Sequence, residues 1–155
     1  MVKTNAMRLL ETAGIPFSAF EYDVSDGDIS GVAVAKKMGQ DPERVFKTLV
    51  TMGKNTGYNV FVIPGNMELD LKKAARTVGD KYIEMIKTRD LEPATGYVHG
   101  GCSPVGMKKQ FPTFIDETAE MYETVYVSGG RVGLQLEVNP ADLAKIAKAA
   151  FRDLV

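Results

Sequence analysis

The chain has 155 residues, 45% of them hydrophobic and 25% charged, and its 19 Lys and Arg against 20 Asp and Glu leave a formal net charge of −1. A chain of this length folds as one domain by default, and its ordinary composition excludes disordered, collagen-like and supercharged nucleic-acid-binding tails. One His, one Cys and no Trp leave too few soft ligands for a structural zinc site and no partner for an internal disulfide.

No export or membrane signal is predicted. The N-terminal segment MVKTNAMRLLETAG has no apolar run of signal-peptide length, and its alternating polar positions suit an amphipathic helix. No stretch approaches the roughly 20 apolar residues of a membrane span. Because an unpaired Cys fits a reducing compartment, we expect a cytoplasmic protein with no membrane partner.

Capping residues and glycine stops predict the elements of the N-terminal part of the chain. Thr4 or Asn5 can cap a first helix, and Gly14 supplies its left-handed stop. In order, the expected elements are this helix, a strand over 15–24 with Pro16 near its start, a helix over 32–38 that Ser30 caps and Gly39 ends, and one helical turn that begins at Pro42.

The middle of the chain is rich in β-branched and aromatic residues. Residues 45–63 predict two antiparallel strands joined by the hairpin loop GKNTG. Asp70 can cap a further helix over LKKAARTV, which Gly79 ends. A short strand over 81–87 and a helical turn over 89–96 follow.

The segment 97–109 (YVHGGCSPVGMKK) predicts an irregular loop because it contains three glycines and Pro104. Helices at both ends and between pairs of strands predict one α+β domain over residues 1–155, built around a mixed sheet. After the loop we expect a strand over 113–117, a helical or irregular stretch over 118–123, a hairpin of strands 124–128 and 133–138, and a final helix over 140–151 with Leu143, Ile146, Ala147 and Ala150 on one face.

Lys47 is the first candidate functional residue. Strand alternation places it on the same face as Val45 and Leu49, so a charge sits inside an apolar strand. An edge-strand lysine can pack its stem and extend its ammonium to water. Here, however, neither face of the strand is polar, so a sheet covered on both sides is expected, and a buried lysine would need an anionic partner or ligand. Both interpretations remain open at this point.

The loop from His99 to Gly106 is the second candidate site. Glycine has no Cβ, so the backbone N–H groups of such a loop can approach a carbonyl oxygen, carboxylate or phosphate. The loop is equally compatible with a long surface turn. It matches neither glycine-rich phosphate-binding pattern, so nucleotide binding through such a motif is not supported.

Standard catalytic and metal-binding groups are not predicted. A three-residue separation does not by itself direct the Cys102 thiol at the His99 imidazole, and nothing in the sequence supplies Ser103 with a general base. The acidic residues between 116 and 123 lack the loop pattern of a calcium site and are typical of a solvated face. With a net charge of −1, we expect any nucleic-acid contact to be local and weak.

Several separated motifs follow one another along the chain: KTNAMRLLETAGIPF, ISGVAVAKKMGQDPERVFKTLV, ELDLKKAA, TGYVHGGCSPVGMKK, FPTFID and VSGGRVGLQLEV. Together they resemble the YbaK/EbsC family, and the resemblance spans nearly the whole chain. That family is similar to the editing domain inserted in bacterial prolyl-tRNA synthetases. The resemblance implies a single α+β domain whose mixed, mostly antiparallel, barrel-like sheet is surrounded by helices. It also implies deacylation of cysteine mischarged onto tRNA(Pro).

The resemblance implies which residues form the site. The family's essential lysine falls on Lys47, and its glycine-rich substrate loop includes Gly101, which takes a catalytic role. At Gln135 the chain departs from relatives that read GLDIEL and carry an acid there, so an electrostatic role is not carried over. The implied substrate-binding residues are Tyr22, Thr48, Gly100, Cys102, Ser103, Pro104 and Ser128.

Under this resemblance the substrate brings the nucleophile. Its cysteine side chain attacks its own ester carbon and releases free tRNA and a cyclic thiolactone, so positioning does most of the work. Lys47 would contact phosphate or ribose 2′/3′ oxygens, and backbone donors from Gly100 to Ser103 would bind the developing oxyanion. The implied partners are the acceptor end of Cys-tRNA(Pro) and prolyl-tRNA synthetase, with Cys-tRNA(Cys) as a further substrate. No cofactor, metal or DNA is expected.

Two other functions fit the same sequence. Relatives of the family edit alanine, serine or other small residues, so the substrate could be another mischarged aminoacyl-tRNA. A non-catalytic module that binds a tRNA end or a synthetase is the third hypothesis, and turnover by purified protein separates it from the other two.

Overall fold

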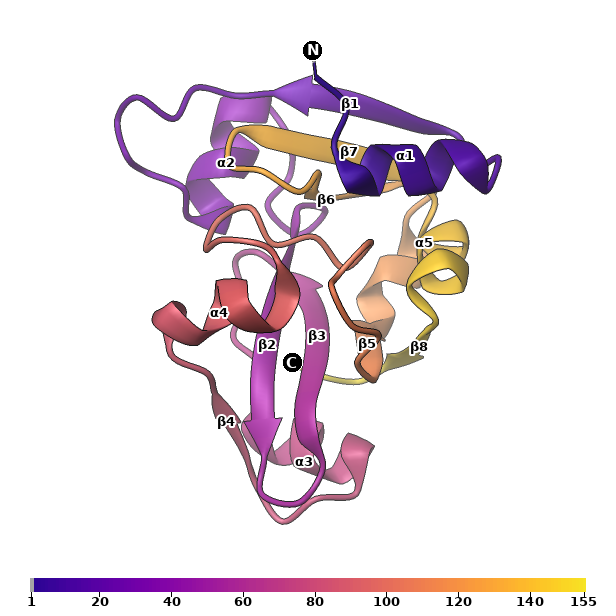
Figure 1. Cartoon of the computed structure of the whole chain (residues 1–155). Coiled ribbons are helices and arrows are strands. Elements are labelled where there is room, and N and C mark those ends of the chain that lie inside the picture. The colour runs from indigo at the N-terminus through magenta and orange to yellow at the C-terminus, as the bar shows by residue number, and fades with distance from the viewer. Residues whose placement is uncertain (1) are drawn as a thin grey trace.

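The strands form two sheets in the computed structural model, which describes residues 2–155 (Figure 1). A parallel bridge between Val45 and Tyr126 joins the sheets. Neighbouring strands are antiparallel except for two parallel pairs, β3 with β5 and β5 with β8. The larger sheet has the order β4 (Ile83–Met85), β2 (Phe46–Gly53), β3 (Gly57–Pro64), β5 (Thr113–Asp116), β8 (Ala149–Arg152), and the smaller has the order β1 (Phe17–Glu21), β7 (Leu134–Val138), β6 (Val125–Ser128).

The helices begin at the capping residues that the sequence indicates. The Thr4 hydroxyl accepts a hydrogen bond from the Met7 N–H, and Ser30, Asp70 and Asn139 cap three further helices in the same way. None of the helices within residues 2–155 is long and apolar enough to cross a membrane. The helices are α1 (Asn5–Thr12), α2 (Gly31–Met38), α3 (Leu71–Val78), α4 (Thr88–Thr95) and α5 (Pro140–Ala147), with a 3₁₀ helix over Glu117–Met121.

The β2–β3 hairpin is covered on both faces, as the apolar sequence predicted. Val60 belongs to a cluster with Leu91 of α4, whereas the next residue, Phe61, belongs to a cluster with Ala74 of α3. The main core contains residues of both sheets, α1 and α5. Figure 1 shows β1 and β7 crossing the top of the molecule, with the β2–β3 hairpin extending below them.

The C-terminal segment corrects the predicted helix over 140–151. α5 ends at Ala147, Lys148 adopts a left-handed conformation with φ 53°, and the following residues form β8, which pairs with β5. Alanine favours helix locally. Pairing nevertheless wins because it satisfies backbone groups along the open edge of β5 and packs Phe151 against the main core.

Smaller differences concern two individual elements and the number of sheets. The first strand covers residues 17–21 rather than 15–24, and the expected turn over 89–96 is the complete helix α4. The α+β class is confirmed, but the strands are divided between two sheets instead of one mixed sheet. This division matters for function because a cavity opens where the sheets meet.

Candidate functional site

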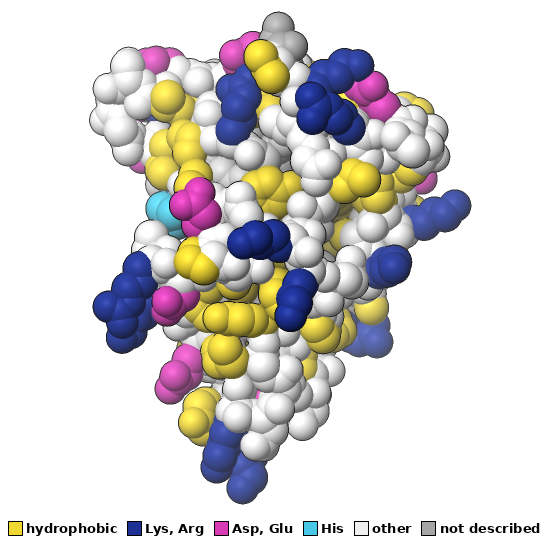
Figure 2. Space-filling model, in the orientation of Figure 1, with side chains coloured by type: hydrophobic (Ala, Val, Ile, Leu, Met, Phe, Trp, Pro, Cys, Tyr) yellow, Lys and Arg dark blue, Asp and Glu magenta, His cyan; other side chains and the backbone are white. Residues whose placement is uncertain are grey.

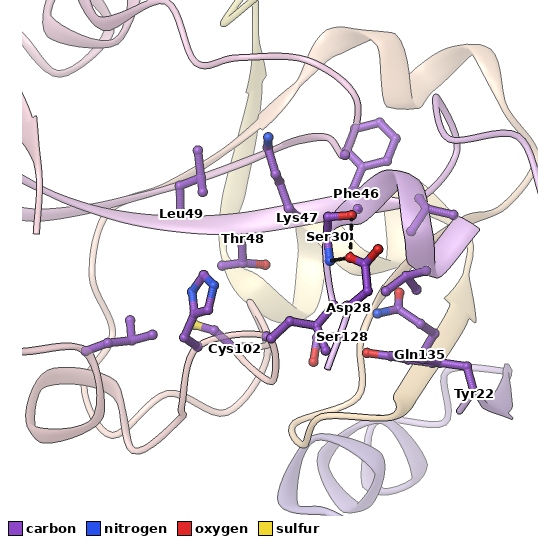
Figure 3. A pocket seen from close by; sticks show the side chains of 18 of the residues that line it. Tyr22, Asp28, Ser30, Phe46, Lys47, Thr48, Leu49, Cys102, Ser128 and Gln135 are labelled. Carbon is purple, nitrogen blue, oxygen red and sulfur yellow. Dashed lines mark hydrogen bonds between the residues drawn. The ribbon is translucent and has the colours of Figure 1, made fainter. Parts of the chain in front are cut away.

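A cavity of about 650 Å³ lies at the junction of the two sheets. Its walls come from the start of β2, the end of β6, the middle of β7, the N-terminal turn of α2 and two loops, 27–30 and 99–102 (Figure 3). Cavities of this size hold small organic ligands or nucleosides. The fold therefore provides one well-formed site with contributions from distant parts of the chain.

The edge of β2 around Thr48 is free and faces this cavity, because it lies between the bridge of Val45 to Tyr126 and the C-terminal part of the strand, which pairs with β4. The Val45 carbonyl accepts a hydrogen bond from the Gly65 N–H (2.7 Å) on the β3 side, whereas the Val50 carbonyl accepts one from Ile86 (3.4 Å) on the β4 side. Main-chain groups alternate in direction along a strand. The N–H and C=O of Thr48 therefore point to the unpaired edge that lines the cavity.

Lys47 and Thr48 leave β2 in opposite directions, with Lys47 and Leu49 on one side and Thr48 on the side of Cys102 (Figure 3). The Lys47 side chain is half-buried, and within residues 2–155 its ammonium forms no hydrogen bond or ion pair. Taking a cation partly out of water without a partner is unfavourable. The structure thus shows no anionic protein partner for Lys47 within residues 2–155, and a lysine that reaches water and one that awaits a ligand both fit this geometry.

Two buried polar atoms of the cavity wall also lack partners. Ser128 and Gln135 oppose each other on β6 and β7 and face the cavity together (Figure 3). Gln135 is 5% exposed, and its Oε1, like the Oγ1 of Thr48, has no hydrogen bond within the described chain. An unsatisfied buried acceptor costs stability, so such atoms are typical of sites that a ligand completes.

Hydrogen bonds within the segment 97–105 support the glycine-rich loop. The Tyr97 hydroxyl donates to the Val105 carbonyl (2.6 Å), and the Ser103 hydroxyl accepts from the Val105 N–H (3.1 Å). Burial raises the pKa of Tyr97 to about 12, which keeps this donor protonated. The hydrogen bond from Tyr97 to Val105 therefore joins the two ends of the loop.

Six of the predicted site residues line the cavity, and three do not. Gly101 donates its N–H to the Val98 carbonyl (3.0 Å), Ser103 is fully buried, and Pro104 lines a separate cavity of about 410 Å³. These three residues support the loop from the protein side. The six that line the cavity are Tyr22, Lys47, Thr48, Gly100, Cys102 and Ser128.

Sequence reasoning missed the wall that α2 and its preceding loop form. A Cβ added to Gly31 would lie 2.7 Å from the Gly65 Cα, and one added to Gly100 would lie 2.4 Å from Cδ1 of Ile29. The sequence does place Gly31 in the first turn of the predicted helix, where glycine is a poor helix former. A glycine at such a position can indicate that another backbone segment packs closely against it. No sequence signal pointed to Ile29. The missed lining residues include Asp28, Ile29, Ser30, Gly31, Gly65 and Glu68.

The cavity contains no activated nucleophile among the described residues. Cys102 is buried, and its desolvation raises the pKa of the thiol to about 12 despite a hydrogen bond with Thr95 that lowers it. His99 lines the cavity but forms no side-chain hydrogen bond within residues 2–155. Neither the thiol of Cys102 nor the imidazole of His99 is therefore paired with an activating group in this cavity.

The comparisons with known proteins agree with this geometry. The model of the aminoacyl-tRNA editing domain matches residues 30–146. An Enterococcus faecalis protein, named as a candidate Cys-tRNA(Pro)/Cys-tRNA(Cys) deacylase, EbsC, is 47% identical over 98% of this chain and 93% of its own. The proline–tRNA ligase of Shouchella clausii is 28% identical over 77% of this chain and 21% of its own length.

A solved structure, described as a candidate trans-editing enzyme for prolyl-tRNA synthetase, has a TM-score of 0.84 and 27% identity, and covers 99% of this chain and 98% of its own. These proteins share a domain that acts on aminoacyl-tRNA. The chain belongs to the aminoacyl-tRNA editing domain family.

The buried thiol generates the first prediction. Because the pKa of Cys102 is about 12, the thiolate is scarce at neutral pH, and we expect iodoacetamide to alkylate the native protein at least about 1,000-fold more slowly than the unfolded chain. Mass spectrometry of timed samples at pH 7.5, with and without guanidinium chloride, measures both rates. Equal rates in the two samples would show that the thiol is accessible and ionised.

Proposed function

We propose that this protein removes cysteine from mischarged Cys-tRNA(Pro), and from Cys-tRNA(Cys), by trans-editing. The name of its Enterococcus faecalis relative supports this substrate. The observation that carries the proposal is the cavity itself, which combines the unpaired ammonium of Lys47 with unpartnered acceptors on Thr48 and Gln135 but offers no ionised nucleophile of the enzyme.

The proposed reaction uses the thiol of the substrate. Its sulfur attacks the carbonyl carbon of its own ester, so that a C–S bond forms and the bond from that carbon to the 3′ oxygen of the tRNA breaks. The electron pair and the thiol proton go to that oxygen, which leaves free tRNA and a cyclic thiolactone. Since both reacting groups lie in one substrate, holding them in the reactive conformation supplies the acceleration.

The residues of the cavity take distinct roles in this proposal. Lys47 binds a phosphate or ribose oxygen of the terminal nucleotide and thereby orients the ester. The main-chain N–H of Thr48 on the free edge of β2, together with the N–H groups of Gly100 and Cys102, stabilises the charge that develops on the carbonyl oxygen. Gly101 acts through its shape, because a Cβ there would lie 2.8 Å from the Val132 nitrogen and displace the loop.

The remaining polar groups recognise the ends of the aminoacyl-adenosine. The Oε1 of Gln135 accepts a hydrogen bond from the α-ammonium of the cysteinyl group, with Ser128 beside it. The ring of Tyr22 packs against the adenosine, and Gly100 and Cys102 of the glycine loop line the same cavity, whereas Ser103 and Pro104 act only by supporting that loop. The tRNA acceptor end is the ligand, and prolyl-tRNA synthetase is the proposed partner that supplies it in the cytoplasm.

Lys47 gives the central mutational test. Lys47→Ala should lower the rate of Cys-tRNA(Pro) deacylation at least about 100-fold, because the charge that orients the terminal nucleotide is lost. The matched control is Lys54→Ala, the same change at an exposed lysine of the β2–β3 hairpin. Release of labelled cysteine measures the rate, and circular dichroism checks the fold. A fully active Lys47→Ala protein would remove the assigned role.

Replacing Gln135 should affect the stability of the fold and the rate of deacylation in opposite directions. Gln135→Met keeps the volume but removes a buried acceptor that has no partner, so the melting temperature should stay the same or rise. Deacylation should nevertheless slow about 10-fold, because the substrate loses one hydrogen bond worth roughly 1 to 2 kcal/mol. Thermal melts measure the change in stability, and steady-state kinetics measure the change in deacylation rate. A loss of stability together with unchanged kinetics would make Gln135 a structural residue.

A further inference from the structure

Lys37 lies near the C-terminal end of α2. Its ammonium binds three oxygen atoms of the acidic turn, residues 23–28, which precedes that helix. Its Nζ lies 2.8 Å from the Asp23 carbonyl, 2.8 Å from Oδ1 of Asp26 and 2.8 Å from the Asp28 carbonyl. The hydrogen bond that Lys37 donates to Asp26 raises the pKa of Lys37 and lowers that of Asp26. The ammonium thus occupies the centre of the turn, where converging oxygens require a cation.

The turn that Lys37 holds forms a wall of the cavity. Gly27, Asp28 and Ile29 all line the cavity, and the chain then enters α2 at Ser30. Asp28 accepts hydrogen bonds from both the N–H (3.3 Å) and the hydroxyl (3.1 Å) of Ser30, which Figure 3 shows beside the cavity. Ile29 meets Gly100 of the opposite loop, so the position of this turn sets the width of the site.

Little else attaches the turn to the body of the protein. The side chains of residues 23–28 are exposed, and no residue of the turn belongs to a hydrophobic core cluster. The other hydrogen bonds, from Ser25 to Asp23 and from the Asp28 N–H to Asp26, lie within the turn and shape it without anchoring it. The three carboxylates of the turn repel one another when no cation lies between them.

We propose that Lys37 is a positioning residue for the editing reaction. Its ammonium holds the acidic turn against α2. The position of the turn then holds Ile29 against the glycine loop, so that the cavity has its shape before the substrate binds. This inference rests on the proposed deacylation. Sites that are held by their own supporting contacts lose activity when those contacts are removed, even though no reacting atom is touched.

The experiment compares two adjacent lysines of the same helix. Lys37→Met removes the contact, and Lys36→Met removes the same charge from an exposed side chain that forms no ion pair within the described chain. We expect Lys37→Met to lower kcat/KM for Cys-tRNA(Pro) about 10-fold, Lys36→Met to leave it within about twofold, and Lys37→Arg to recover most of the loss. An equal loss in both Met variants would show that Lys37 only contributes charge toward the tRNA.

Amide hydrogen exchange of the free protein tests, independently of catalysis, whether Lys37 holds the acidic turn in place. Residues 23–29 should exchange faster in Lys37→Met than in the wild type or Lys36→Met, while the strands keep their protection. Unchanged exchange in the turn would overturn the proposal. So would a loss of activity that merely follows the folded fraction in a thermal melt.

Asp26→Ala removes the side-chain acceptor of Lys37 from the turn and replaces Lys37→Met if that variant does not fold. An inactive wild-type protein would refute the proposed deacylation, whereas the exchange rates would still decide whether Lys37 holds the turn.

Discussion

The site depends on how the chain is held around Val45, where the two sheets join. The Val45 carbonyl binds the Gly65 N–H at 2.7 Å, and a bridge to Tyr126 connects the same residue to β6. Gly31 and Gly65 then meet backbone to backbone, with no room for a Cβ between them. These contacts place the start of β2, the end of β6 and the first turn of α2 around one cavity and leave the neighbouring edge of β2 unpaired.

An unpaired strand edge is normally a liability, because its N–H and C=O groups can pair with another chain. Here the edge around Thr48 lines a cavity between the two sheets. The same groups become fixed hydrogen-bonding partners for a ligand, alongside the glycine loop. Fixed main-chain dipoles need no reorganisation during a reaction, which is the property that stabilises a developing oxyanion.

The scarcity of His and Cys in the sequence agrees with the proposed chemistry. An aminoacyl ester is already activated, and a cysteinyl ester carries its own nucleophile, so the enzyme has no need of an ionised thiol. Burial raises the pKa of the only Cys of the chain to about 12, so its thiolate is even scarcer at neutral pH than that of an exposed thiol. Under the proposed mechanism the site must supply orientation, and Lys47 with the two unpartnered acceptors is proposed to provide it.

Much of this arrangement could be predicted from local sequence. Capping side chains such as Thr4 and Asp70 located the helices, and alternation correctly placed the side chain of Lys47 on the same side as that of Leu49. These features depend on neighbouring residues, which a sequence displays directly.

The remainder depends on contacts between distant segments. β8 forms only because the edge of β5 is open to it, so the sequence around residue 149 gave no reason to end the helix early. Likewise, Ile29 lines the cavity, where it contacts Gly100 of the opposite loop. Gly101 does not line the cavity, and it packs instead against the backbone of residues 131 and 132, while Ser103 is also outside the lining. Such tertiary relations have no local signature.

The central claim is that the enzyme positions a substrate that supplies its own nucleophile. The most direct measurement is the ratio of kcat/KM values of the wild-type protein for Cys-tRNA(Pro) and Ser-tRNA(Pro), substrates that differ only in sulfur against oxygen. Because a thiol is far more nucleophilic than a hydroxyl, the account predicts a preference for the cysteinyl substrate of at least about 100-fold. Equal rates for the two would contradict it, since the nucleophile would then have to come from water or from the enzyme.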